Sequence, residues 1–333
     1  MEKVFIEYLN RRHIKLYDVF RVFYARQSSS QSDKIGQLPE RIGRYQLVKT
    51  AMACSESRKY RIAAYQTKGG ARAYLKLWEG SAKGPAYYGL LNELRIYNIL
   101  SALQISKVSG GSNEVTTPRL LHVIQDERRL GILVSAMDGM AIDLVPLPQR
   151  LRELQRVLRF MDTLYVQLHK NSDLENSVLE FSFAHERILF FMALCMATLA
   201  HPTLFFKAIY AAYKYIRYAR LAADYSHRTL VHRDLARANV LYDAGALSII
   251  DFEATIKASK ALEIAQMLAE VCNNPELFRQ YAHRLARTML QSTDSARAAY
   301  VCTSLYVAFL HLGTKQQYSF ADYSLYLNYV LSL

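Results

Sequence analysis

The stretch VHRDLARANVLYDAGALSIIDFE, residues 231–253, holds two carboxylates and an amide at spacings that could bind a metal ion. Two short apolar runs in it are separated by an Asp-Ala-Gly turn, which indicates a hairpin. Such a hairpin brings Asn239, at the start of one strand, near Asp251, at the end of the other, with Asp234 in the preceding loop. Oxygen ligands of this kind suit Mg²⁺, which binds few protein groups and completes its shell with water and phosphate. The alternative is an ordinary turn that these polar residues cap.

The sequence His-Arg-Asp-Leu, the Asn five residues after its Asp, and the later Asp-Phe resemble the catalytic loop and metal motif of the protein-kinase-like superfamily. The resemblance implies that Asp234 accepts the proton of an acceptor hydroxyl or orients it, and that Asn239 and Asp251 hold Mg²⁺. It also implies ATP as the phosphate donor. Arg233 and Arg237 lie beside the predicted base and are candidate contacts to the acceptor.

Further residues that match the superfamily lie upstream, among segments with strand-like patterns. These segments are residues 44–51, 60–67, 72–78, 118–125 and 130–137, with one helical pattern at 86–103. Lys76, on the third strand, resembles the lysine that contacts the α- and β-phosphates, and Glu93 resembles its ion-pair partner on the helix. Without that order, a lone Lys on a strand is usually solvated and a helical Glu usually faces water. Ser135, Ala136 and Met137 resemble the hinge between lobes, where backbone groups meet adenine.

The pattern as a whole predicts an α+β protein with a bilobal, protein-kinase-like fold. We expect a five-stranded antiparallel N-lobe with one helix at residues 41–140, which binds nucleotide. The C-lobe at 141–333 is expected to be mostly helical, with extra helices, and to carry the catalytic loop and the metal site. Residues 1–40 are predicted to be a helical extension that ends in a polar linker.

The composition favours an anionic partner. The 333 residues include 42 Lys and Arg against 29 Asp and Glu, a net charge of +13. The basic residues are dispersed and no nucleic-acid reader motif is present, so we expect no nucleic-acid partner. The four cysteines lie far apart, which argues against a zinc site and suits free thiols in a reducing compartment.

Departures from protein kinases indicate a small-molecule acceptor. Glu253 follows Asp-Phe where protein kinases have Gly, and additional helical segments precede the catalytic loop. These features resemble aminoglycoside, choline and related kinases, or lipopolysaccharide-core sugar kinases. We therefore predict an ATP-dependent phosphotransferase acting on a hydroxyl of a small molecule or sugar, with an anionic acceptor favoured by the charge. The loop at 51–59 contains no Gly, which keeps a catalytically inactive binding module as one alternative; a protein kinase is the other.

The expected location is the cytoplasm, with peripheral contact to an anionic membrane at its inner face. Residues 1–40 contain a basic, aromatic helical pattern that could lie on such a surface. Residues 188–206 form the most apolar stretch, but His201 and Pro202 interrupt it. Since a spanning helix needs about 20 apolar residues, a buried or interfacial helix is favoured over a span.

Overall fold

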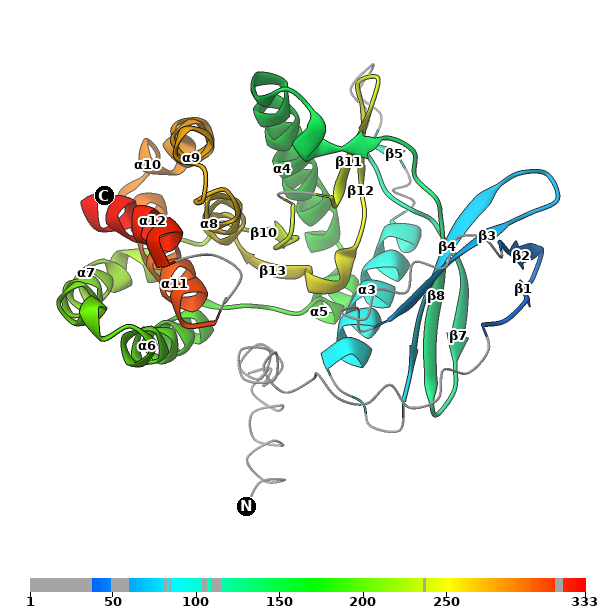
Figure 1. The fold of residues 1–333 in the computed structure, drawn as a ribbon, viewed down its shortest axis with the longest axis horizontal. Coiled ribbons are helices and arrows are strands. Elements are labelled where there is room, and N and C mark those ends of the chain that lie inside the picture. The colour runs from blue at the N-terminus through cyan, green and yellow to red at the C-terminus, as the bar shows by residue number, and fades with distance from the viewer. Residues whose placement is uncertain are drawn as a thin grey trace. The chain divides into compact units, whose positions relative to one another are not determined.

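A computed structural model describes residues 38–48, 60–80, 83, 85–103, 107–108, 115–235, 238–314 and 320–333. The contacts divide the chain into two compact units (Figure 1). The first unit contains the described residues up to Met140 together with Leu241–Ala254, and the second contains Ala141–Val240 and Thr255–Leu333. The sequence predicted two lobes with a single boundary at residue 140. The contacts instead assign Leu241–Ala254, which lies beyond that boundary, to the first unit. Residues 1–37 of the predicted extension lie outside the described residues.

An antiparallel sheet forms most of the first unit. Its strand order is β1-β2-β3-β4-β8-β7, with bounds Arg41–Ile42, Tyr45–Leu47, Arg61–Gln66, Arg72–Glu79, Arg129–Ser135 and Leu120–Gln125. The α+β class is confirmed, but the sheet has six strands where five were predicted. The extra strand arises because the chain turns at Gly43, which has a φ of +56°, so the first strand pairs back as a short hairpin.

The alternation of β4 explains why one of its residues leaves the core. Leu75 and Leu77 point to the same side of the sheet and are fully buried with other apolar residues. Lys76 lies between them and points to the opposite side, where helix α3 (Pro85–Ala102) packs against β4 and β8. The helix places its buried Leu90, Leu94 and Tyr97 inward. The strand period and the helix packing thus bring charged groups of both elements to the same layer.

A second, smaller sheet carries the predicted hairpin. Its order is β5-β6-β12-β11-β9, with bounds Lys107–Val108, Val115–Thr116, Ala246–Ile249, Val240–Asp243 and Met140–Ala141. Ala244 and Gly245 both have positive φ, +44° and +100°, as the two central residues of a tight hairpin turn require. Gly139 also has positive φ, and a Cβ there would lie 2.9 Å from the carbonyl oxygen of Tyr242. Only Gly therefore allows this close approach of two backbones.

The second unit is mostly helical, as predicted. Its helices are α4 (Leu147–His169), α5 (Ser172–Ser177), α6 (Phe183–Ala200), α7 (Phe205–Ala223), α8 (Lys260–Glu270), α9 (Pro275–Tyr281), α10 (Arg287–Leu290), α11 (Asp294–Thr314) and α12 (Phe320–Ser332). The short turns η1 (Ile142–Leu144), η2 (Pro202–Leu204) and the π-helix η4 (Ala282–Ala286) complete the helical part. Helix α11 is the central one, since it packs against α6, α7, α8 and α12. Strands β10 (Arg228–Val231) and β13 (Ile256–Ser259) pair antiparallel beside them.

One described helix, α6, is long and apolar enough to cross a membrane by length and composition alone. A core helix of a soluble protein meets the same criteria, so this is weak evidence. The helix ends at Ala200 and Pro202 opens a 3₁₀ turn, so residues 188–206 do not form one continuous helix.

Glu186 is a buried carboxyl in the helical core, and it predicts a specific dependence of stability on pH. It accepts a hydrogen bond of 2.7 Å from the Thr303 hydroxyl, and the Tyr215 hydroxyl lies 3.5 Å away. Burial raises the pKa of Glu186 to about 7. Because the folded state binds this proton more tightly than the unfolded state, the contribution is complete at acidic pH and is lost as pH rises through 7.

We expect Glu186→Gln to remove this part of the pH dependence. A raised carboxyl pKa of this size corresponds to about 3 kcal/mol, so the variant should gain up to that amount over the wild type at pH 8 and little at pH 4. Urea unfolding at both values measures the difference. The exposed Glu276→Gln is the control, and an equal gain at both pH values would contradict the assignment.

Candidate active site

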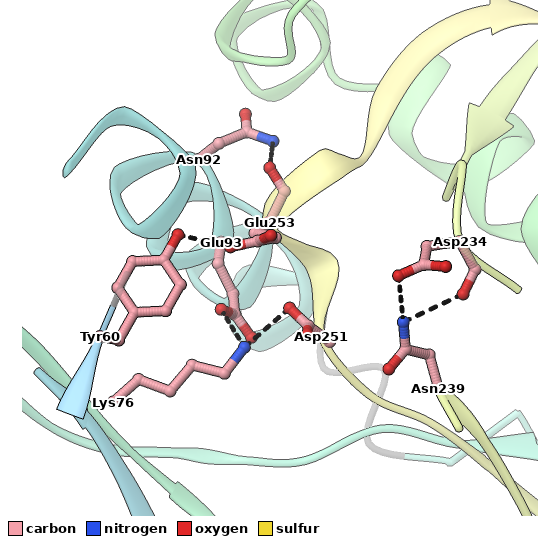
Figure 2. A network of polar contacts seen from close by, with 8 residues as sticks. All are labelled: Tyr60, Lys76, Asn92, Glu93, Asp234, Asn239, Asp251 and Glu253. Carbon is pink, nitrogen blue, oxygen red and sulfur yellow. Dashed lines mark hydrogen bonds and ion pairs between the residues drawn. The ribbon is translucent and has the colours of Figure 1, made fainter. Parts of the chain in front are cut away.

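The first unit contains a polar cluster built around Lys76 (Figure 2). Its Nζ lies 2.8 Å from Glu93 Oε2 and 2.7 Å from Asp251 Oδ1. The Glu93 side chain is 1% exposed, while those of Lys76 and Asp251 are 15% and 31% exposed. Strand β4, helix α3 and the segment after β12 each supply one residue. The cluster therefore joins a buried anchor, Glu93, to a carboxylate that solvent can reach.

The electrostatics keep Lys76 charged. Burial alone would lower the pKa of Lys76, but the carboxylates of Glu93 and Asp251 outweigh it and raise that pKa above its usual value. Burial also raises the pKa of Glu93, and the ammonium opposes that rise. An ammonium fixed in this way has the charge and the placement that binding of an anionic group requires.

Further contacts fix the segment that follows Asp251. The side chain of Glu253 accepts a hydrogen bond from the Tyr60 hydroxyl, and its carbonyl oxygen accepts one of 3.1 Å from Asn92 Nδ2 (Figure 2). The Phe252 ring, fully buried, meets Tyr97 of α3 edge to face. Asp251 itself has a φ of +65°, a costly conformation for a residue other than Gly. Glu253 thus has a definite structural role in holding Asp251.

The second unit contains the other predicted pair. Asn239 Nδ2 donates hydrogen bonds to the carbonyl oxygen of Asp234 at 3.0 Å and to its Oδ2 at 2.7 Å. Asp234 is exposed and Asn239 is half-buried. Figure 2 shows the amide oxygen of Asn239 pointing away from Asp234. The NH₂ group of the Asn239 amide therefore binds the Asp234 carboxylate, and the amide oxygen is directed away from it.

Glu263, in α8, is a residue that the sequence analysis missed. Its carboxylate accepts hydrogen bonds from the backbone N–H groups of His232 and Arg233, and the latter measure 3.1 and 3.2 Å. Burial raises the pKa of Glu263 to about 7, although these backbone donors oppose the shift. Arg233 has a φ of +71°, so the loop before Asp234 is held in a strained conformation. We infer that Glu263 positions the loop.

Glu263→Ala should leave two backbone N–H groups, the buried one of His232 and the partly buried one of Arg233, without their acceptor. The expected cost is about 1–3 kcal/mol for each group left unsatisfied. In addition, kcat should fall more than the affinity for nucleotide, because the Lys76 cluster belongs to the other unit. Glu263→Gln keeps one acceptor oxygen and should give intermediate values of both. Unchanged kcat in the Ala variant would contradict a positioning role.

Two backbone N–H groups of the predicted hinge already donate hydrogen bonds within the first unit. The N–H of Ser135 donates to the carbonyl of Arg119 at 2.9 Å, and the N–H of Ala136 donates to that of Arg72 at 3.0 Å. An adenine that meets a backbone N–H in this stretch would therefore need Met137. Of the predicted acceptor contacts, Arg233 is half-buried, while Arg237 lies outside the described residues, as does the loop at 51–59.

The candidate metal ligands fit Mg²⁺ in their chemistry. Within the described part of the chain, no three His, Cys, Asp or Glu side chains are grouped to hold a metal ion. Mg²⁺ does not need such a group, since it keeps several waters and takes one or two carboxylates. Asp251 offers a partly exposed carboxylate and Asn239 an amide oxygen. The two residues belong to different units, and their joint binding of one ion is a proposal.

The fold is that of a phosphotransferase of the protein-kinase-like kind. Residues 55–298 match the model of the phosphotransferase enzyme family, which is most of the chain, and the protein belongs to that family. The protein is therefore a phosphotransferase, as the sequence predicted. A search of curated proteins gave no match.

Solved structures support the fold. A thermostable variant of aminoglycoside phosphotransferase APH(4)-Ia, bound to AMP-PNP and hygromycin B, has a TM-score of 0.54 at 16% identity, covering 93% of this chain and 97% of that chain. Another structure of APH(4)-Ia gives 0.51 at 13% identity, covering 94% and 97%.

Proposed function

We propose that the protein transfers the γ-phosphate of ATP to a hydroxyl of a small molecule or sugar, with Asp234 as the base. The observation that carries the proposal is the placement of Lys76 Nζ between Glu93 and Asp251. A strand lysine held by a buried carboxylate, next to a more exposed one, suits a bound nucleotide phosphate. Family membership supports the reaction class.

The two units divide the work in this proposal. In the first unit Lys76 binds the α- and β-phosphates and Glu93 fixes its position, while the hinge at Ser135, Ala136 and Met137 meets adenine. In the second unit Asp234 orients the acceptor hydroxyl and takes its proton. The hydroxyl oxygen then forms a bond to the γ-phosphorus as the bond to the β-phosphate oxygen breaks, and ADP leaves. Mg²⁺, held by Asn239 and Asp251, would neutralise charge on the phosphates.

An anionic acceptor is the preferred class. The net charge of +13 suits a phosphorylated sugar or another anionic glycan better than a polycation. Arg233 and Arg237, beside the base, would bind such a group. A relative with the same fold was solved with hygromycin B, which makes aminoglycosides the main competing class in a screen.

A cytoplasmic location goes with this function. The reaction consumes ATP, and the described cysteines, Cys195, Cys272 and Cys302, are not joined in disulfides. The alternatives that the sequence left open gain no support. The inactive binding module depended on a loop outside the described residues, and the family of the chain disfavours a protein kinase.

Two measurements test the proposal. A thermal-shift titration with ATP and Mg²⁺ should raise the melting temperature, and no shift at millimolar ATP would contradict nucleotide binding. Transfer from labelled ATP should then be screened over sugars, sugar phosphates, aminoglycosides and lipopolysaccharide fragments. Arg237→Gln should weaken a phosphorylated acceptor more than its unphosphorylated form, whereas the exposed Arg279→Gln should weaken neither.

A further inference from the structure

Helices α6 and α7 present an exposed apolar surface that the proposed reaction does not use. Most of the large apolar side chains that are exposed among the described residues belong to these helices and the turn between them. We use the name α6–α7 face for the surface formed by Leu199, Phe206, Ile209, Tyr210, Tyr213 and Ile216. Leu199 is 83% exposed and Phe206 is 81% exposed. Contiguous apolar exposure of this kind on a soluble protein usually marks an interaction site.

The spacing along α7 shows that this face is one stripe. Residues 206, 209, 210, 213 and 216 recur every three or four positions and lie on the outer side of the helix. The inner side, with Ala208, Ala211 and Tyr215, is already buried. The two helices lie side by side against α11 (Figure 1). The outer stripe therefore remains after the core packing of α7 is complete.

The charges on and around the stripe are mainly positive. Arg217 and Arg220 continue it toward the C-terminal end of α7, and both are exposed, as is Arg187 on α6. Between Phe183 and Ala223 the sequence has one acidic residue, Glu186, which is buried. Asp224, which is exposed, caps the C-terminal end of α7, so the surface of both helices offers apolar groups and three exposed arginines beside one exposed carboxylate from residues 183–224.

We propose that the α6–α7 face docks the protein on the surface of an anionic lipid bilayer. Apolar and aromatic side chains inserted at the headgroup level, beside arginines that meet lipid phosphates, are the features of an interfacial helix. Charge complementarity selects this occupant. A second copy of the chain would bring three arginines, Arg187, Arg217 and Arg220, against a single exposed carboxylate of these helices, Asp224, so most of the cations would lack a partner. Helix α7 would lie in the surface plane, because its Lys and Arg residues oppose a span.

The surface overlaps only in part, at Leu199 and Phe206, with the segments that the sequence suggested for a membrane contact. Those segments were residues 1–40 and 188–206. Of the first, residues 1–37 lie outside the described residues. The docking surface that we assign extends into α7 as far as Arg220. It does not depend on the identity of the acceptor or on catalysis, so its failure would leave the proposed reaction untouched.

Vesicle flotation of the full chain tests the docking. The protein should bind mixed phosphatidylglycerol and phosphatidylcholine vesicles at low salt, and bind pure phosphatidylcholine far more weakly. Arg217→Gln with Arg220→Gln should weaken the binding roughly thirtyfold. The matched control, Arg279→Gln with Arg284→Gln, removes the same charge from exposed residues of α9 and η4. Equal losses in both pairs would reduce the effect to net charge and overturn the proposal.

Apolar variants provide the independent arm. Phe206→Ser with Ile209→Ser should weaken vesicle binding by on the order of 100-fold, while Leu144→Ser with Val166→Ser, exposed elsewhere, should not. All four side chains are exposed, so melting temperatures should remain close to that of the wild type. Failure of the wild type to float with anionic vesicles would overturn the proposal. A dimer that forms without lipid would also overturn it, if sedimentation shows that Phe206→Ser with Ile209→Ser is the one variant pair that dissociates the dimer.

Discussion

Asp234→Asn should lower the rate of phosphate transfer by about 10²–10⁴-fold and leave ATP affinity unchanged, because a positioned general base contributes that much. The amide that replaces the carboxylate still has an oxygen able to accept from Asn239 Nδ2, as Asp234 Oδ2 does at 2.7 Å. The loop should therefore keep its conformation while it loses the group that takes the proton. Single-turnover kinetics with labelled ATP measure the chemical step directly.

The control for this variant is Asp243→Asn. Asp243 is an exposed carboxylate at the end of β11, in the same stretch of sequence. Its replacement changes the net charge by the same amount and should leave transfer unaffected. Wild-type rates in Asp234→Asn would contradict the assignment of the base. They would leave the assignment of Lys76 intact.

Lys76→Met should destabilise the protein by about 3–5 kcal/mol and abolish measurable transfer, because removal of one partner leaves a buried charge uncompensated. Glu93 would remain at 1% exposure without the ammonium that now lies 2.8 Å away, and Asp251 would lose its contact at 2.7 Å. Loss of a single group that stabilises developing charge typically costs 10²–10³-fold in rate. Urea unfolding and the transfer assay measure the two losses separately.

The pair Lys76→Met and Glu93→Gln separates structure from chemistry. Since the second change removes the uncompensated carboxylate, much of the lost stability should return. Activity should not return, because the cation that meets the phosphates is still absent. Lys68→Met, at an exposed turn residue, should change stability by less than about 0.5 kcal/mol. Recovery of activity in the double variant would contradict the role of Lys76.

The sequence was informative where local rules determine geometry. A tight turn with Gly245 brings the ends of two short strands together, so Asn239 and Asp251 could be assigned to one hairpin from spacing alone. The period of two along β4 separates Lys76 from Leu75 and Leu77 in the same direct way. Family resemblance then supplied the roles. Those roles rest on the motif and await the variants described above.

Other features depended on contacts between distant segments. Glu263 lies 31 residues after His232 and binds backbone N–H groups, which carry no sequence signal. The bond from Tyr60 to Glu253 joins residues 193 positions apart. The outer stripe of α7 was not predicted, because a helix that is apolar on both sides is expected to be buried. Exposure of one side becomes visible only when the neighbours of the helix are known.

The contacts of Glu253 bear on how enzymes of this kind are found in genomes. A search pattern that demands Gly after Asp-Phe would reject this chain, although its Phe252 ring is buried against Tyr97 and its Asp251 meets Lys76. Here the third letter of the motif is replaced by a side chain that bonds to Tyr60. A pattern that accepts Glu at this position when a hydroxyl-bearing residue directly precedes β3, the strand before the one that carries the lysine, would recover sequences that the stricter one discards.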